Sequence, residues 1–282
     1  MTEALAAQPE LVAPRRRRGL AIGLWLAVAW LAALGLAAAF ASVLPIADPL
    51  ALHPSNGFAP PGPGHWFGTD QLGRDQFSRV IYGARVSLTV GLTASALAAV
   101  VGGTLGLVAG YSGRFTESAI MGVVDILLAF PALILALSLT AFLGASVRNV
   151  ITAIAVLAVP AFARVTRSVT KSLATRDFVQ AARVLGASHR RIIARELAPN
   201  VFPTVLAYTL VTIAIAMVVE GSLSFLGLGV PPPAPTWGTM IAANKGQLAN
   251  APYLALIPAG VLLLTVLALN VLGERLRGRA DR

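Results

Sequence analysis

"QAARVLGASHRRIIARELAPN", residues 180–200, is a cationic, helix-forming segment with a single glycine, set in a chain that is otherwise apolar. The chain has 282 residues, of which 56% are hydrophobic and 12% charged, whereas soluble domains carry about 25% charged residues. This composition predicts an integral membrane protein in which the quoted segment lies outside the bilayer.

Six apolar stretches are long enough to cross a bilayer, which takes about 20 residues. Backbone groups in lipid must be hydrogen-bonded within the segment, so the stretches are expected to be helices. The first is too long for the apolar region of a cleaved signal peptide, which has about 7 to 15 residues. We therefore predict an all-α integral membrane protein with six transmembrane helices, at 20–44, 86–110, 119–143, 150–165, 204–226 and 253–272.

Basic residues determine the predicted orientation. With a cytoplasmic N-terminus, seventeen of the 22 Lys and Arg residues fall on the cytoplasmic side, so the positive-inside rule places both termini in the cytoplasm. The net charge of +10 then reflects topology rather than nucleic-acid binding. The predicted order is a basic tail (1–19), the first span (20–44), an extracytoplasmic loop (45–85), a five-span core (86–272) with a cytoplasmic loop at about 167–200, and a basic tail (273–282).

The cytoplasmic loop is predicted to fold as helix, turn, helix. Phe178, Ala181, Ala182 and Leu185 follow the i, i+3, i+4, i+7 spacing of one apolar helix face. Gly186 suits a helix C-terminus. A second short helix is expected to carry Ile192, to be capped by Ser188 and to end at Pro199.

The pattern alone leaves three uses of this loop open. Its arginines would enforce topology or contact anionic lipid, its apolar face would lie on the protein's own spans, or that face would enter a groove on a partner protein.

The spacing of Ala181-Ala182, Gly186 and Pro199 resembles the "EAA" loop of permease subunits in ATP-binding-cassette (ABC) importers, with Gln180 where the family has Glu and Ala198 where it has a larger apolar residue. Two more segments, FGTDQLGRDQFSRVIYGARVSL (67–88) and SFLGLGVPPPAPTWGTMI (224–241), resemble the second permease subunit of the oligopeptide, dipeptide and nickel branch.

The resemblance implies the type I importer permease fold and a role in moving short peptides or related small solutes across the bacterial inner membrane. It also implies a homologous second permease, two ATPase subunits that bind ATP and Mg, an extracytoplasmic solute-binding protein and surrounding lipid. This chain would then hold no cofactor, metal or catalytic residue, and it contains no G-x-x-x-x-G-K-[S/T] loop for ATP phosphates.

In that family the loop forms a coupling helix that docks on the ATPase. Phe178, Ala181, Leu185 and Ile192 are the residues expected to enter the ATPase groove, while arginines orient the contact. The full expected coupling site is Phe178, Gln180, Ala181, Ala182, Arg183, Leu185, Gly186, Arg190, Ile192 and Pro199.

The extracytoplasmic segment 68–86 is predicted to be an interfacial helix with an Asp75–Arg79 pair at i, i+4. It serves either as a structural lid or, by resemblance, as a docking surface for the solute-binding protein. Trp66 and Trp237 are expected to anchor at the outer membrane interface.

Small residues recur every four positions in the second span, at Gly102, Gly106 and Gly110. Such a stripe allows two helix backbones to approach closely. We expect it to pack against a helix of the same chain rather than to form a dimer interface.

Two acidic residues in the spans are candidates for the translocation pathway. Asp125 lies about 12 Å into the third span, where an acid must face protein or water. A hydrogen bond to a hydroxyl group, or protonation, would give it a structural role instead. Glu220 is expected either at the mouth of the pathway or among headgroups. The alternative function, an ion-coupled secondary transporter, would use Asp125 as its ion or proton site.

Overall fold

A computed structural model of the chain describes residues 17–280. Within this range the protein is helical and has no named strand. The helices are α1 (Arg17–Ala39), α2 (Gln76–Tyr111), α3 (Arg114–Ala129), α4 (Ala132–Leu143), α5 (Val147–Ala174), α6 (Asp177–Val184), α7 (His189–Arg191), α8 (Ala198–Phe225), α9 (Trp237–Asn244) and α10 (Tyr253–Ala280), with short turns η1 (Pro54–Asn56), η2 (Ile192–Leu197) and η3 (Lys245–Gln247). Arg15 and Arg16 of the predicted basic tail lie outside the described residues.

The described chain contains five helices long and apolar enough to cross a membrane, or six if the bent pair α3–α4 is counted as one span. This confirms the all-α fold. The third span is not the straight helix expected over 119–143, because α3 and α4 meet at an angle of 89°. Pro131 forces Phe130 out of the helical region, to a ψ of 137°.

The prediction of a separate interfacial helix before the second span is wrong. The expected interfacial helix at 68–86 is not separate: the helix begins at Gln76 and runs without a break to Tyr111. Asp75 caps its start by accepting a hydrogen bond from the Ser78 amide at 2.8 Å. Of the residues assigned to a helix lying flat, 76–86 are therefore the outer turns of α2, and 68–75 belong to the loop before it.

The glycine stripe of α2 packs against α5 of the same chain, as predicted. A Cβ on Gly102 would lie 2.4 Å from the Val159 carbonyl oxygen, and one on Gly110 would lie 2.6 Å from the Thr170 side chain. Only glycine allows the two backbones to approach this closely. Helices α2 and α5 also form the most extensive helix–helix contact in the described part of the chain.

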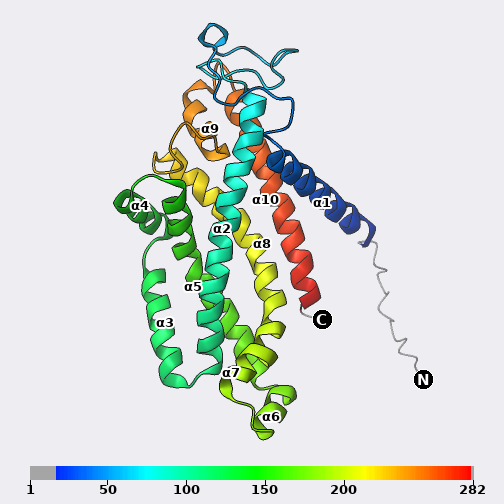
Figure 1. The fold of residues 1–282 in the computed structure, drawn as a ribbon, viewed down its shortest axis with the longest axis vertical. Coiled ribbons are helices and arrows are strands. Elements are labelled where there is room, and N and C mark those ends of the chain that lie inside the picture. The colour runs from blue at the N-terminus through cyan, green and yellow to red at the C-terminus, as the bar shows by residue number, and fades with distance from the viewer. Residues whose placement is uncertain (1–16, 281–282) are drawn as a thin grey trace, which may run out of the picture.

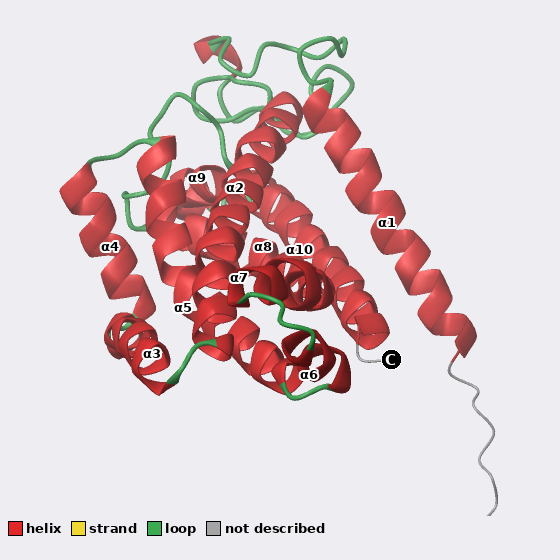
Figure 2. Ribbon diagram, turned by 60° about the horizontal axis from the view of Figure 1, so that its bottom comes forward, coloured by secondary structure: helices red, strands yellow, loops and turns green. Residues whose placement is uncertain are grey.

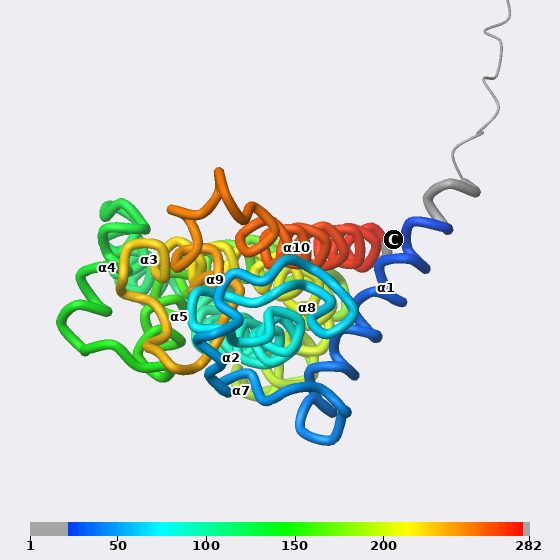
Figure 3. The backbone as a smooth tube through the Cα atoms, turned by 90° about the horizontal axis from the view of Figure 1, so that it is seen from above, coloured from blue at the N-terminus to red at the C-terminus, as the bar shows by residue number. Residues whose placement is uncertain are grey.

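The two ends of the bundle differ. Helices α6 and α7 lie at one end, whereas the loop at 45–75 and α9 lie at the other (Figure 1). Seen from above, α3 and α4 flank one side of the bundle and α1 the opposite side (Figure 3). Helices α2, α5 and α8 lie between them and connect the two ends.

Replacing Gly106 by Ala is expected to destabilise the chain. The new methyl group would lie 2.4 Å from the Ala163 carbonyl oxygen, so α2 and α5 must separate, and overpacking of this kind costs about 1 to 3 kcal/mol. Thermal unfolding of the purified chain in detergent measures the effect. Gly260→Ala in α10 is the matched control, because its Cβ would meet no atom within 4 Å; equal melting temperatures for the two variants would contradict the packing.

Candidate functional site

The loop that the sequence predicts to be cytoplasmic folds as expected up to its second helix. Helix α6 ends before Gly186, which has a φ of +78°. The Ala187 amide donates to the Ala182 carbonyl and the Gly186 amide to the Arg183 carbonyl, both at 3.0 Å, which is the hydrogen-bond pattern of a glycine-terminated helix. Ser188 then caps α7 by accepting from the Arg191 amide. Figure 2 shows α6 and α7 at the end of the molecule that faces the viewer.

The loop does not end where Pro199 was expected to close it. Helix α7 continues through the π-helical turn η2 into α8, and Pro199 lies in the first turn of α8. Proline has no amide hydrogen and its ring displaces the carbonyl four residues earlier. The wider turn accommodates this, because the Ala198 amide donates to the Ile193 carbonyl, five residues back. The loop is thus joined directly to the fifth span.

One face of the loop packs on the protein itself. Val179, Ile192 and Leu197 are buried together against Leu107 and Tyr111 of α2. Ile192 was expected to enter a partner's groove; this is wrong, because its side chain is enclosed by the chain's own spans. Ala182 also packs against this cluster. An isoleucine suits either face of such a loop, so sequence spacing alone does not distinguish the two positions.

The opposite face of α6 is apolar and exposed. Leu185 is 85% exposed and Val184 88%, and Phe178 and Ala181 are also exposed. Val184 was missed by the sequence analysis, although its position three residues after Ala181 places it on this face. We call Phe178, Ala181, Val184 and Leu185 the exposed apolar face of α6.

Two polar residues of the loop fasten it to neighbouring helices. Arg183 donates from Nε to the Tyr111 hydroxyl at 3.3 Å, and its guanidinium lies 5.0 Å from the centre of that ring. Gln180 donates from Nε2 to the Ala174 carbonyl at 3.2 Å. Gln180, where the family has Glu, therefore bonds to the end of α5, while Arg190 and Gly186 stay exposed.

Asp125 is paired with a residue that was not predicted. Its Oδ1 accepts a hydrogen bond from Arg164 Nη2 of α5 at 2.7 Å, in place of the hydroxyl partner expected for a structural role. Arg164 lies ten residues before the end of α5, about 15 Å along the helix axis. Each charged group near the bilayer centre costs about 2.5 to 3.5 kcal/mol by insertion scales, and the ion pair offsets part of this cost.

Glu220 does not line an open passage in this conformation. Its carboxylate is buried and accepts hydrogen bonds from Ser224 and Thr236, both at 2.8 Å. Thr236 also caps α9. Glu220 thus joins the outer end of α8 to the proline-rich loop before α9. Its side chain is enclosed by protein and is in contact with neither headgroups nor water.

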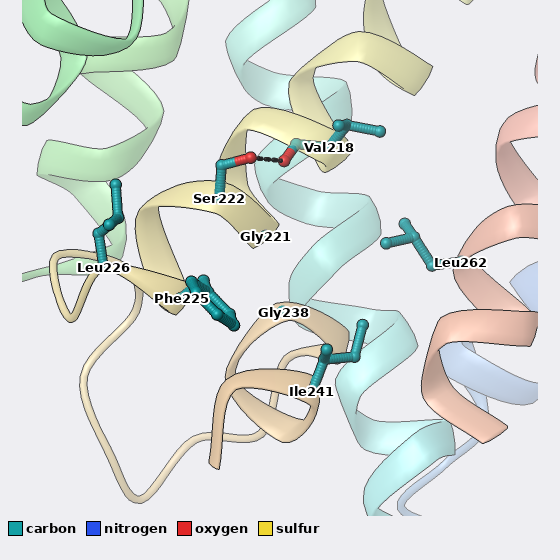
Figure 4. A pocket seen from close by; sticks show the side chains of 8 residues that line it. All are labelled: Val218, Gly221, Ser222, Phe225, Leu226, Gly238, Ile241 and Leu262. Atoms are coloured by element: carbon teal, nitrogen blue, oxygen red, sulfur yellow. Dashed lines mark hydrogen bonds between the residues drawn. The ribbon is translucent and has the colours of Figure 1, made fainter. Parts of the chain in front are cut away.

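Trp237 is also buried rather than at the membrane interface. Its indole Nε1 donates to the Val80 carbonyl of α2 at 3.0 Å. The cavity beside α9 has a volume of about 370 Å³ and is lined by uncharged residues, among them Gly221, Phe225, Gly238 and Leu262 (Figure 4). The segment 224–241 therefore serves mainly to hold α8, α9 and α2 together.

The outer segment 67–76 forms an internal polar network. Asp70 accepts hydrogen bonds from Arg74 Nε at 2.7 Å and from the amides of Leu72 and Arg74. Gln76 Nε2 donates to the Leu254 carbonyl of α10 at 2.8 Å. These contacts hold the loop on the ends of α2 and α10.

The predicted Asp75–Arg79 ion pair does not form. Asp75 uses its two carboxylate oxygens to cap α2 and to bond His65 Nδ1 at 2.9 Å. Arg79 instead donates to the Pro49 carbonyl at 3.1 Å. A helix-capping acid directs its oxygens at the first-turn amides, which takes Asp75 away from Arg79.

Comparison with known proteins identifies the class. Residues 102–282 match the family described as "Binding-protein-dependent transport system inner membrane component". The chain is 40% identical over 246 residues to the dipeptide transport system permease protein of Alkalihalophilus pseudofirmus, covering 87% of this chain and 81% of the relative. It is 38% identical over 221 residues to the glutathione transport system permease protein of Pectobacterium atrosepticum, covering 78% of this chain and 73% of the relative.

A solved structure supports the fold. A chain of the MetNI methionine ABC transporter, in an inward-facing conformation, superposes with a TM-score of 0.62 and 18% identity over 72% of this chain and 97% of that chain. The six-crossing fold is that of an importer permease. The chain belongs to the family of binding-protein-dependent transport system inner membrane components.

Membership of this family makes the chain a multi-pass inner-membrane permease subunit of an ABC importer, which works with ATPase and substrate-binding partners. The ion-coupled alternative finds no support. The matching family is that of binding-protein-dependent transport systems, and the pairing of Asp125 with Arg164 does not by itself point to an ion site.

The buried role of Glu220 can be separated from a pathway role by two substitutions. Glu220→Gln keeps an oxygen that accepts from Ser224 and Thr236, so uptake and thermal stability should stay close to those of the wild type. Glu220→Leu removes the acceptor of both hydroxyls: Ser224 loses its hydrogen-bond partner, at a cost of about 1 to 3 kcal/mol, while Thr236 keeps its bonds to Thr239. The melting temperature should fall. A Gln variant that is stable but inactive in uptake would show that the charge itself acts in transport.

Proposed function

We propose that this chain is a permease subunit that moves short peptides or related small solutes across the bacterial inner membrane. The relatives that are named for dipeptide and glutathione transport support this substrate class, since both solutes are small peptides. ATP and Mg would be bound by the ATPase partners and not by this chain.

The exposed apolar face of α6 is the single observation that carries the coupling mechanism. Exposed clusters of large apolar side chains mark contact sites, and a short amphipathic helix is suited to a groove on a partner protein. The other face of α6 packs on α2 and α5. A shift of the ATPase groove would therefore move the inner ends of these spans together with α6.

The other partners follow from the remaining surfaces. Helices α3 and α4 expose most of their apolar side chains, including Phe115 and Phe142, and we assign this flank to a homologous second permease and to lipid. The outer loop would receive the solute-binding protein, near the exposed Trp66. Both termini would be cytoplasmic, because that orientation places the basic loop around α6 and α7 inside.

Asp substitutions on the exposed face of α6 test the coupling mechanism. Val184→Asp and Leu185→Asp should each lower ATP-driven uptake about tenfold or more, because burying an unpaired carboxylate in an apolar groove removes a contact of hot-spot size. Membrane insertion should stay normal, since both side chains are exposed. Gly186→Pro should also uncouple ATP hydrolysis from uptake. Proline cannot adopt the φ of +78° at this position, so the turn after α6 would change shape.

Val43→Asp is the matched control, because Val43 is 74% exposed but lies beyond the outer end of α1. Uptake and ATP hydrolysis are measured in the reconstituted complex. Normal uptake in both α6 variants would contradict the coupling role.

A further inference from the structure

Two ion-pair sites connect α3 to α5, and they differ in exposure. At the first, Glu117 accepts from both Arg167 and Lys171, and its side chain is only 17% exposed. At the second, Asp125 and Arg164 remain 59% and 56% exposed although they are bonded to each other. The carboxylate of Glu117 is largely covered, whereas Asp125 and Arg164 each leave more than half of the side chain exposed.

The open pair has unused hydrogen-bonding capacity. Within the described residues Arg164 donates only through Nη2, and Asp125 accepts only at Oδ1. A guanidinium carries five N–H donors and a carboxylate two oxygens. Both a cationic donor group and an anionic acceptor are thus available to a further molecule at one place.

A cleft is lined in part by Ala161, one turn of α5 before Arg164. It has a volume of about 160 Å³ and is lined by α4, α5 and α8, with Ala132, Leu157, Ala158, Ala161, Tyr208 and Thr212 among the lining residues. Leu157, Ala161 and Arg164 are spaced at i, i+4 and i+7, so they share one side of the helix. The cleft therefore offers a mainly apolar surface beside paired charges.

The exposed side of the pair is not suited to lipid. Charged side chains within spans face a bundle interior or a water-filled cavity. A pair that is more than half exposed in the isolated chain must accordingly face water or protein in the assembled transporter. A pair that faces water in the assembled transporter would lie, with the cleft, where a polar solute can pass.

We propose that Arg164, Asp125 and the adjoining cleft form a transient binding site for the backbone of a short zwitterionic peptide. Arg164 binds the terminal carboxylate, in which a planar guanidinium finds a matching acceptor. Asp125 binds the terminal ammonium group, and the cleft takes a small side chain. This inference rests on the proposed peptide import, and it makes the two residues specificity determinants of the pathway.

The test uses the absence of cysteine from the chain. Ala161→Cys is introduced into the full nucleotide-free complex, and the rate of modification by a charged methanethiosulfonate reagent is measured with and without the dipeptide alanylalanine. The cysteine should react, because the cleft faces water, and the dipeptide should slow the reaction. An N-acetylated, C-amidated alanylalanine should give no protection.

The variants Arg164→Gln and Asp125→Asn, made in the Ala161→Cys background, should each raise the dipeptide concentration needed for half-protection about tenfold or more, as expected for loss of a charge-assisted hydrogen bond. Glu117→Gln is the matched control, because it removes the other paired acid of α3 and should leave protection unchanged. A complex that contains the unsubstituted, cysteine-free chain measures how much of the reagent labels the partner subunits.

Three results would overturn the proposal: a cysteine that never reacts, protection by the end-blocked dipeptide equal to that by the free one, or equal protection in all variants. ATP-driven uptake of alanylalanine by the unsubstituted complex is measured in parallel. Uptake without specific protection refutes this site and leaves the proposed function intact, whereas absence of peptide uptake refutes the proposed function itself.

Discussion

The close contact between α2 and α5 is the constraint on which the rest of the molecule depends. Backbone meets backbone at Gly102, Gly106 and Gly110, over which a side chain of any size would clash. The outer end of α2 receives Trp237 and the loop network through Gln76, and its inner end supplies Tyr111 to the coupling loop. A tight helix pair thus connects the outer cap to the surface that would meet the ATPase, which allows movement at one end to reach the other.

Helix α3 is attached in a different way. Val124 is its only buried residue in the described chain, and its contacts to α5 include the ion pairs of Glu117 and Asp125. The exposed pair of Asp125 and Arg164 could exchange contacts with a solute, whereas the glycine-lined contact between the α2 and α5 backbones could not. The bundle therefore combines a fixed pair, α2 and α5, with a flank whose charges remain partly open.

Local signals in the sequence were sufficient for much of this structure. Apolar length predicted the crossings, the spacing of glycines predicted the α2–α5 packing, and Gly186 and Ser188 predicted the turn of the loop.

Errors arose where a tertiary contact decided the outcome. Arg164 pairs with Asp125 across 39 positions, and Ile192 and Trp237 are buried by helices distant in sequence. Val184 was overlooked because it lies six residues after Phe178 and so falls outside the i, i+3, i+4, i+7 spacing, although it lies three residues after Ala181 on the same face.

The central claim is that the exposed apolar face of α6 lies in a groove of the ATPase. Because the chain has no cysteine, a single cysteine at position 184 can be cross-linked in the assembled complex without background from this subunit. The account predicts a cross-link to the ATPase from Val184→Cys and none from Val43→Cys, which lies beyond the outer end of α1. No cross-link from Val184→Cys, in a complex that retains ATP-driven uptake, would contradict it.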